Sequence, residues 1–199
     1  ARLTPSSPPQ SPADDDAALA MPGISHLETI GAIARSADAP SVEICLADVE
    51  SRGVLSLASH KSNAVVIREN MESSSPPEMH LLARWRVCHV RRGVVGLQSV
   101  VTKRWLGHNP RGVVQAAAGK CRNWEHLRLE FGAVMNDEQA CMVRIVGTDW
   151  HHGNGAYYTA KDRKGGERML RCSPKGCPAA EAAHFVLTVH TPIQGRSSR

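Results

Sequence analysis

The residues best suited to chemistry form one short segment, residues 149–155, which reads Asp-Trp-His-His-Gly-Asn-Gly. The adjacent imidazoles of His151 and His152, next to an aspartate, could act as an acid and a base or bind a zinc ion. Two thiols, Cys172 and Cys177, are separated by four residues and could join these histidines in a zinc site. The sequence therefore raises two metal hypotheses, one hydrolytic and one structural.

The run His151 to Gly155 resembles the paired-histidine signature of zinc-dependent histone deacetylases. Those enzymes are much longer α/β proteins with further aspartate ligands, whereas this run follows a short strand-like segment and precedes Tyr157. That setting favours a glycine-rich turn between two strands. We therefore expect no enzymatic activity, no catalytic residue, no cofactor and no bound metal. If a metal were bound, its ligands would come from His151, His152, Cys172 and Cys177.

Three histidines recur at comparable places, because His80, His126 and His184 each directly precede a large apolar residue. Their convergence would create a metal site. However, side chains alternate along a strand, and the apolar neighbours are expected to point inward. We predict that these histidines point outward at three separate places, and that Glu125 is a structural acid.

Positive charge is concentrated in the middle of the chain, which carries a formal net charge of +5. Residues 1–41 hold two basic and five acidic residues, whereas residues 84–128 hold ten basic residues and one acidic residue. Such a field attracts acidic partners. We predict a basic binding face formed by Arg91, Arg92, Lys103, Arg104, Arg111, Lys120 and Arg122.

Composition divides the chain into a tail, one domain and a short second tail. Residues 1–40 form an acidic tail that is predicted to be disordered, with helical spacing of apolar residues over 24–35. Residues 192–199 are expected to be flexible. The sequence shows no apolar run long enough to span a membrane and no secretion signal, which favours a cytoplasmic location. The six cysteines are irregularly spaced and are predicted to be reduced and mostly buried.

Residues 41–191 show a threefold repeat, with units of about 42–86, 87–138 and 139–191. Each unit contains four short strand-like runs separated by turn residues, and twelve such strands suit a closed antiparallel fold. The fourth runs are predicted at Met79–Leu82, Trp124–Leu129 and His184–Val189. The predicted core residues are Leu46, Leu97, Trp105, Trp124, Leu127, Ile145, Tyr157 and Phe185.

The middle unit, Gly93 to Phe131, carries the clearest pattern. An alternating run at Val95–Ser99 is followed by Lys103-Arg104-Trp105-Leu106, then by Val113–Ala116, and then by a segment containing Trp124-Glu125. This order resembles the fascin-like subgroup of β-trefoil domains. The resemblance implies an all-β trefoil that acts as a non-catalytic binding or adaptor module. Several members with tandem trefoils bundle actin filaments, so a single trefoil is expected to bind an acidic filament through one site.

Other ligands fit the same fold. Ricin-type lectins are trefoils that carry a Gln-x-Trp signature in each unit, and this sequence contains none. That kind of sugar binding is disfavoured, but a glycan or another anionic ligand in a trefoil pocket is the alternative function. Nucleic-acid binding is disfavoured because Trp105 and Trp124 are assigned to the core, which leaves no interleaved aromatic platform.

Overall fold

A computed structural model describes residues 22–38, 42–69, 77–132, 141–148, 155–162, 168–172 and 177–190. The predictions for residues 1–21 and 192–199, and for the paired histidines His151 and His152, lie outside this part of the chain. The first unit contains β1 (Val42–Asp48), β2 (Val54–Leu57), β3 (Val65–Arg68), helix α2 (Pro77–Leu82) and β4 (Trp85–Arg91). The second contains β5 (Val94–Ser99), β6 (Trp105–His108), β7 (Val114–Ala118), the 3-10 turn η1 (Asn123–Glu125) and β8 (Leu127–Phe131). The third contains β9 (Cys141–Gly147), β10 (Ala156–Asp162), β11 (Arg168–Cys172), the 3-10 turn η2 (Ala179–Glu181) and β12 (His184–His190).

The first and fourth strands of the three units close a barrel. β1 pairs with β4, β4 with β5, β5 with β8, β8 with β9, β9 with β12, and β12 with β1, all antiparallel. Closure leaves these six strands without an unpaired edge, which removes the aggregation hazard of an open sheet. The ring can form because alternation along the strands, as in β1, directs one row of side chains inward.

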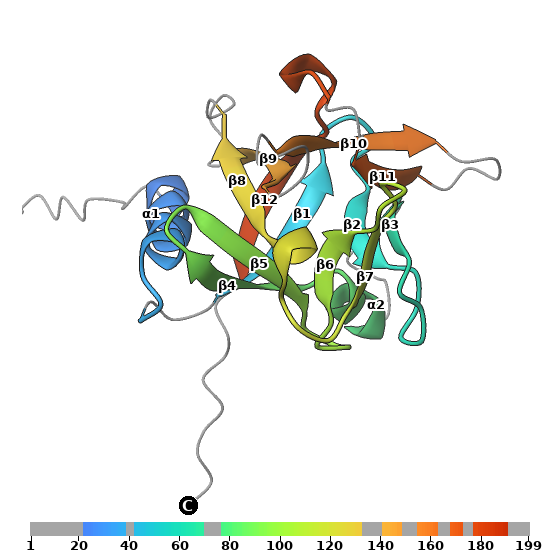
Figure 1. Cartoon of the computed structure of the whole chain (residues 1–199), viewed down its shortest axis with the longest axis horizontal. Coiled ribbons are helices and arrows are strands. Elements are labelled where there is room, and N and C mark those ends of the chain that lie inside the picture. Colours follow the sequence, from blue (N-terminus) through green and yellow to red (C-terminus); the bar gives the residue numbers. More distant parts are fainter. Residues whose placement is uncertain are drawn as a thin grey trace, which may run out of the picture.

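The second and third strands of each unit form a hairpin, and the three hairpins cap one end of the barrel. β3 pairs with β11, while isolated bridges join Ala64 to Gln115 and Val113 to Arg171. In Figure 1 the hairpins gather on the side of the barrel away from α1. Backbone hydrogen bonds therefore join every unit to the other two, so each unit depends on the other two for part of its strand pairing.

Equivalent positions of the three units meet in the core. Trp85, Leu127 and Phe185 are each fully buried near the start of a fourth strand. They pair with Ser99, Gly147 and Asp48 at the ends of three first strands. Leu46, Leu97 and Ile145, two residues earlier in those strands, are also fully buried. The barrel interior thus follows the threefold repeat that the sequence shows.

Helix α1 (Pro22–Arg35) covers the hairpin between β4 and β5. Ile30 and Ile33 are almost completely buried and belong to the same apolar core as the barrel. The backbone amide of Gly93 donates to the Ala34 carbonyl oxygen, and His89 Nδ1 lies 2.8 Å from the Ile33 carbonyl oxygen. The helical segment of the tail therefore packs as part of the domain.

The fourth strand of the first unit was predicted wrongly. Met79–Leu82 lies in α2, which begins at Pro77, and proline is favoured at the first position of a helix. The fourth strand is instead β4, which extends to Arg91, so the first unit ends in the turn after Arg91 and not after residue 86. His80 accordingly lies on a helix, whereas His126 and His184 adjoin or begin strands.

Three predicted core aromatics lie elsewhere. Tyr158, not Tyr157, fills the interior, and Tyr157 donates a 2.7 Å hydrogen bond to Glu130 Oε2 on the outside of the barrel. Trp105 is half-buried, and the next residue along β6, Leu106, is the one that is buried in the core. Trp124 belongs to η1, before the strand that it was expected to join, and is 37% exposed. A shift of one residue moves a strand side chain to the opposite face of its sheet, which explains the first two errors.

Candidate functional site

The loop between β7 and β8 lines an open groove on the surface of the domain. Residues 118–126 line this groove, which has a volume of about 1020 Å³. Lys120, Arg122, Asn123 and Trp124 are exposed along it. The groove therefore combines two cations, an amide and an indole on nine consecutive residues, and we refer to it as the loop groove.

Local hydrogen bonds fix the shape of the loop groove. The backbone amide of Arg122 donates to Glu125 Oε2 at 2.9 Å, and the Glu125 amide donates to the Arg122 carbonyl oxygen at 2.9 Å. A Cβ added at Gly107 would lie 2.7 Å from the Trp124 carbonyl oxygen, so η1 packs directly on the backbone of β6. Burial raises the pKa of the Glu125 carboxyl.

The buried His108 ring stacks on the Trp124 indole. The rings of His108 and Trp124 are stacked with centroids 5.9 Å apart and planes 5° apart, and His108 Nδ1 lies 3.3 Å from the Tyr158 hydroxyl. His108 is 3% exposed, and burial lowers its pKa to about 4. An aromatic that lines the groove is thus held by residues from the second and third units. Neither His108 nor Tyr158 stood out in the sequence, because their proximity depends on the cap hairpins.

We expect acid to destabilise the protein through His108. Below about pH 6.5 the unfolded chain binds a proton at this residue that the folded chain excludes until about pH 4. Lowering the pH from 7 to 4.5 should therefore remove about 2–3 kcal/mol of stability through this group alone. Urea unfolding of the wild type and of His108→Gln at both pH values checks this. The variant should lose less on acidification, and equal losses would contradict it.

The predicted basic residues occupy four different turns. Lys103 and Arg104 precede β6, and Lys120 follows β7, so these three lie at the same end of the hairpin whose register pairs Trp105 with Ala118. Arg111 lies in the turn at the other end of that hairpin, roughly 10 Å away along β6. Arg91 and Arg92 lie at the tip of the β4–β5 hairpin, about 20 Å from Lys103 along β5. The seven cations therefore do not share one face, and four of them, Lys103, Arg104, Lys120 and Arg122, gather at the loop-groove end.

A second recess adjoins this end of the hairpin. Its volume is about 450 Å³, and it lies between the β2–β3 turn, residues 60–63, and the β5–β6 turn, residues 101–104. Arg104 Nη1 donates to Asn63 Oδ1 across it, which joins the first and second units. Arg104 thus has a structural contact as well as a charge.

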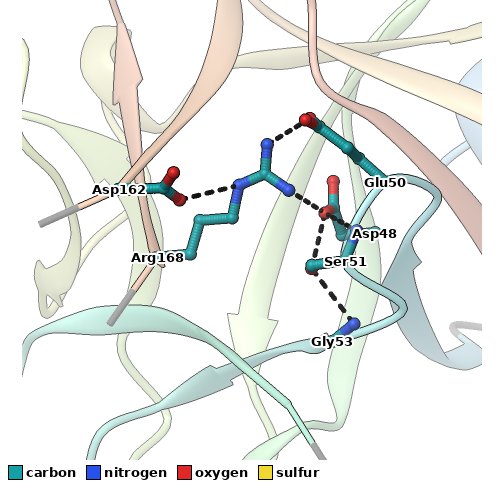
Figure 2. Close-up of polar contacts among 6 residues, drawn as sticks. All are labelled: Asp48, Glu50, Ser51, Gly53, Asp162 and Arg168. Carbon is teal, nitrogen blue, oxygen red and sulfur yellow. Dashed lines mark hydrogen bonds and ion pairs between the residues drawn. The ribbon is translucent and has the colours of Figure 1, made fainter. Parts of the chain in front are cut away.

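A different cluster of charge lies between the first and third units (Figure 2). The Arg168 guanidinium donates to Asp48 Oδ2 at 2.8 Å and to Glu50, and its Nε lies 3.5 Å from Asp162 Oδ1. Asp48 also accepts from the backbone amide and hydroxyl of Ser51, at 2.9 and 2.7 Å. Asp48 is 2% exposed, so its ion pair with Arg168 is a buried clamp between the β1–β2 turn and the β10–β11 hairpin, whereas Glu50 and Asp162 are exposed around it.

The described residues contain no group of three or more His, Cys, Asp or Glu side chains placed to hold a metal ion. Cys172 is buried in β11 and Cys177 is half-buried, while their suggested partners His151 and His152 fall outside the described chain. All six cysteines carry free thiols, but only Cys141 and Cys172 are fully buried. The expectation of mostly buried thiols was therefore wrong, and four of them are partly accessible. Within the described helices, none is long and apolar enough to cross a membrane.

The closed barrel with its three-hairpin cap defines an all-β trefoil, which confirms the fold predicted from the repeat. Among solved structures, the chain is similar to the designed threefold-symmetric protein ThreeFoil, with a TM-score of 0.52 and 11% sequence identity. The similarity covers 73% of this chain and 97% of ThreeFoil. No protein-family model and no curated protein matches the sequence, so the fascin-like resemblance stays a prediction.

Proposed function

We propose that this chain is a non-enzymatic binding module whose loop groove captures a glycan that carries an anionic group. The observation that carries the proposal is Trp124, whose ring is exposed along an open groove and is stacked on His108. Binding sites combine aromatic surface with a few placed polar groups. A sugar ring offers an apolar face to an indole, and Lys120 and Arg122 offer charge to a carboxylate or sulfate.

Pre-organisation supports binding at the loop groove. The Arg122–Glu125 hydrogen bonds, the close approach at Gly107 and the stacking of His108 all act on the same short loop. Fewer degrees of freedom are then lost when a ligand binds, so more of the contact energy contributes to affinity. An unrestrained loop of the same composition would bind more weakly.

Two acid–base groups at the loop groove, Glu125 and His108, have contacts that favour a binding role over a catalytic one. Glu125 Oε2 accepts a hydrogen bond from the Arg122 backbone amide, and the His108 ring lies between the rings of Trp124 and Tyr158. A catalytic acid or base must reach a proton on the substrate. Glu125 instead shapes the wall of the groove, and His108, which lies outside the lining, stacks on the Trp124 ring.

Replacing Trp124 by Ala should weaken ligand binding about tenfold or more, because a truncated tryptophan anchor commonly costs over 1 kcal/mol of binding free energy. A glycan array with neutral, uronic-acid and sulfated members supplies the ligand, and titration calorimetry measures the affinities. The double variant Lys120→Ala and Arg122→Ala should lose affinity and salt dependence. Arg111→Ala is the matched control, since Arg111 lies at the far end of the same hairpin. No array signal above background would overturn the proposal.

An acidic protein surface, such as the actin filament that the fascin-like resemblance implies, is the second candidate. The gathering of Lys103, Arg104, Lys120 and Arg122 at one end of the β6–β7 hairpin favours it. Filament co-sedimentation over a salt series separates the two candidates. Filament binding should survive Trp124→Ala and disappear when the four cations are replaced by Ala, whereas no pelleting at low salt would remove this candidate.

A further inference from the structure

Cys88 and Cys121 both lie beside Gly96, on the outer face of the β4–β5 hairpin. Cys88 in β4 is paired directly with Gly96 in β5, so any side chain at Gly96 would lie beside that of Cys88. The Sγ atom of Cys121, from the loop groove, lies 3.0 Å from the position that a Cβ at Gly96 would take. Two ring atoms of Trp105 lie closer still, at 2.7 and 2.9 Å, so the missing side chain of Gly96 makes room for both the Trp105 indole and the Cys121 thiol.

The separation of the two cysteines follows from this register. Directly opposed residues on antiparallel strands have Cβ atoms about 4.5–5.5 Å apart. Cys121 Sγ then lies within about 8 Å of Cys88 Cβ, whereas a disulfide requires the two sulfurs to approach to about 2 Å. Cys121 precedes the turn that the Arg122–Glu125 hydrogen bonds fix, and Gly119 has open space beside it, so a rotamer change at Cys121 and a backbone adjustment over residues 119–121 bring the sulfurs together.

Neither thiol is committed to a strong contact. The Cys121 thiol faces the Glu125 carbonyl oxygen at 3.7 Å, and the Cys88 thiol faces the Arg86 carbonyl oxygen at 4.0 Å. Both residues are partly accessible to solvent. The contacts that a disulfide would replace are therefore weak ones.

We propose that Cys88 and Cys121 form a reversible disulfide that fastens the loop groove to the barrel wall. Because Cys121 lines that groove, the bond changes the position of the loop that carries Lys120 and Arg122. The regulatory part of this inference, that oxidation alters ligand affinity, rests on the proposed function. Formation of the bond itself does not.

Glutathione disulfide is an oxidant of the required class. The Cys121 thiolate attacks one sulfur of glutathione disulfide, which forms a mixed disulfide and releases one glutathione thiolate. The Cys88 thiolate then attacks the Cys121 sulfur and releases the second glutathione. The two protons from the protein thiols end on the two glutathione molecules, and the two electrons lost by the protein reduce the glutathione disulfide.

Oxidation should be slow at neutral pH and faster in base. Burial, and then the nearby Glu125 and Cys88, raise the pKa of Cys121 to about 11. Since the thiolate is the attacking species, the rate should rise close to tenfold per pH unit between pH 7 and 9. A rate independent of pH over this range would contradict direct attack by Cys121.

Peptide mapping tests the bond directly. The folded protein is incubated with glutathione disulfide, the remaining thiols are alkylated, and the unreduced digest is analysed by mass spectrometry. We expect a linked peptide pair containing Cys88 and Cys121, absent in Cys88→Ser and in Cys121→Ser. Cys45→Ser is the matched control and should retain it, and Cys177→Ser removes competition from the Cys172–Cys177 pair. Glutathione adducts without this link would overturn the proposal.

Affinity measured on the same samples tests regulation separately. The best ligand from the glycan array should bind the oxidised and reduced proteins with affinities that differ severalfold, and Cys88→Ser should abolish the difference. Equal affinities would overturn the regulatory part while the mapped disulfide stands. If no array glycan binds, the proposed function fails, and the peptide map still decides whether the bond forms.

Discussion

Replacing Trp85 by Ala is expected to lower the free energy of unfolding by about 3–5 kcal/mol, the range for truncating a buried aromatic. Trp85 is fully buried, and its indole Nε1 donates to the Leu55 carbonyl oxygen at 3.0 Å. The substitution leaves a cavity between the barrel and the cap and also removes the donor for a buried carbonyl. Urea unfolding followed by far-UV circular dichroism measures the loss.

Trp124→Ala is the matched control, because both substitutions remove an indole. Trp124 is 37% exposed on η1, so its replacement should cost less than about 1 kcal/mol. The two tryptophans thus separate the observed packing from the one predicted by sequence, in which Trp124 filled the core. Similar losses at both positions would contradict the observed packing.

Replacing Arg168 by Ala should cost about 3–4 kcal/mol, because breaking a buried ion pair leaves an uncompensated charge. The Arg168 side chain is 11% exposed, and its partner Asp48 accepts from it at 2.8 Å. The substitution would loosen the junction between the first and third units (Figure 2). Thermal and urea unfolding at neutral pH give the size of the effect.

Two further variants separate the contribution of the Arg168–Asp48 ion pair from that of side-chain packing. Arg128→Ala removes an arginine that pairs with Glu130 but is 49% exposed, and it should cost less than about 1 kcal/mol. In the Arg168→Ala background, Asp48→Asn should restore part of the lost stability, because it removes the unpaired carboxylate while an oxygen still accepts from Ser51. Additive losses in this double-mutant cycle would show that packing, not charge, dominates at Arg168.

The threefold repeat, the alternation of apolar residues and the residue types in the turns predicted the fold well. The predicted runs Val95–Ser99, Val113–Ala116 and His184–Val189 overlap β5, β7 and β12, because each is an apolar run that lies between turn residues. Equivalent positions such as Leu46, Leu97 and Ile145 repeat at spacings that strand pairing reproduces. Local sequence patterns suffice to predict the fold because each unit supplies two barrel strands and one cap hairpin in the same order.

Sequence reasoning failed where tertiary contacts decide between neighbouring residues. Tyr157 and Tyr158 are equally apolar, and only the pairing of β10 with β9 decides that Tyr158 faces inward. Leu81 and Leu82 looked like a strand, but Pro77 starts a helix there in which Leu82 is buried and Leu81 is exposed, and the fourth strand begins at Trp85.

The candidate site was predicted only in part. Lys120 and Arg122 were chosen for their charge, and they do line the loop groove. His108 and Tyr158 were missed because they come from different units and meet Trp124 only after the cap has formed. Trp124 was assigned to the core because a three-residue 3-10 turn is too short to show a periodic pattern, so the sequence does not indicate that the indole is exposed.

The pairing of β1 with β12 has a consequence for biosynthesis. Six consecutive residue pairs join the first strand of the barrel to the last, from Glu43 with His190 to Asp48 with Phe185. On the ribosome, β1 emerges long before its partner and must wait with an unpaired edge while nearly the whole domain is translated. The nascent chain is therefore most vulnerable to misassociation until β12 has left the exit tunnel, and a chaperone acting in that interval would protect β1.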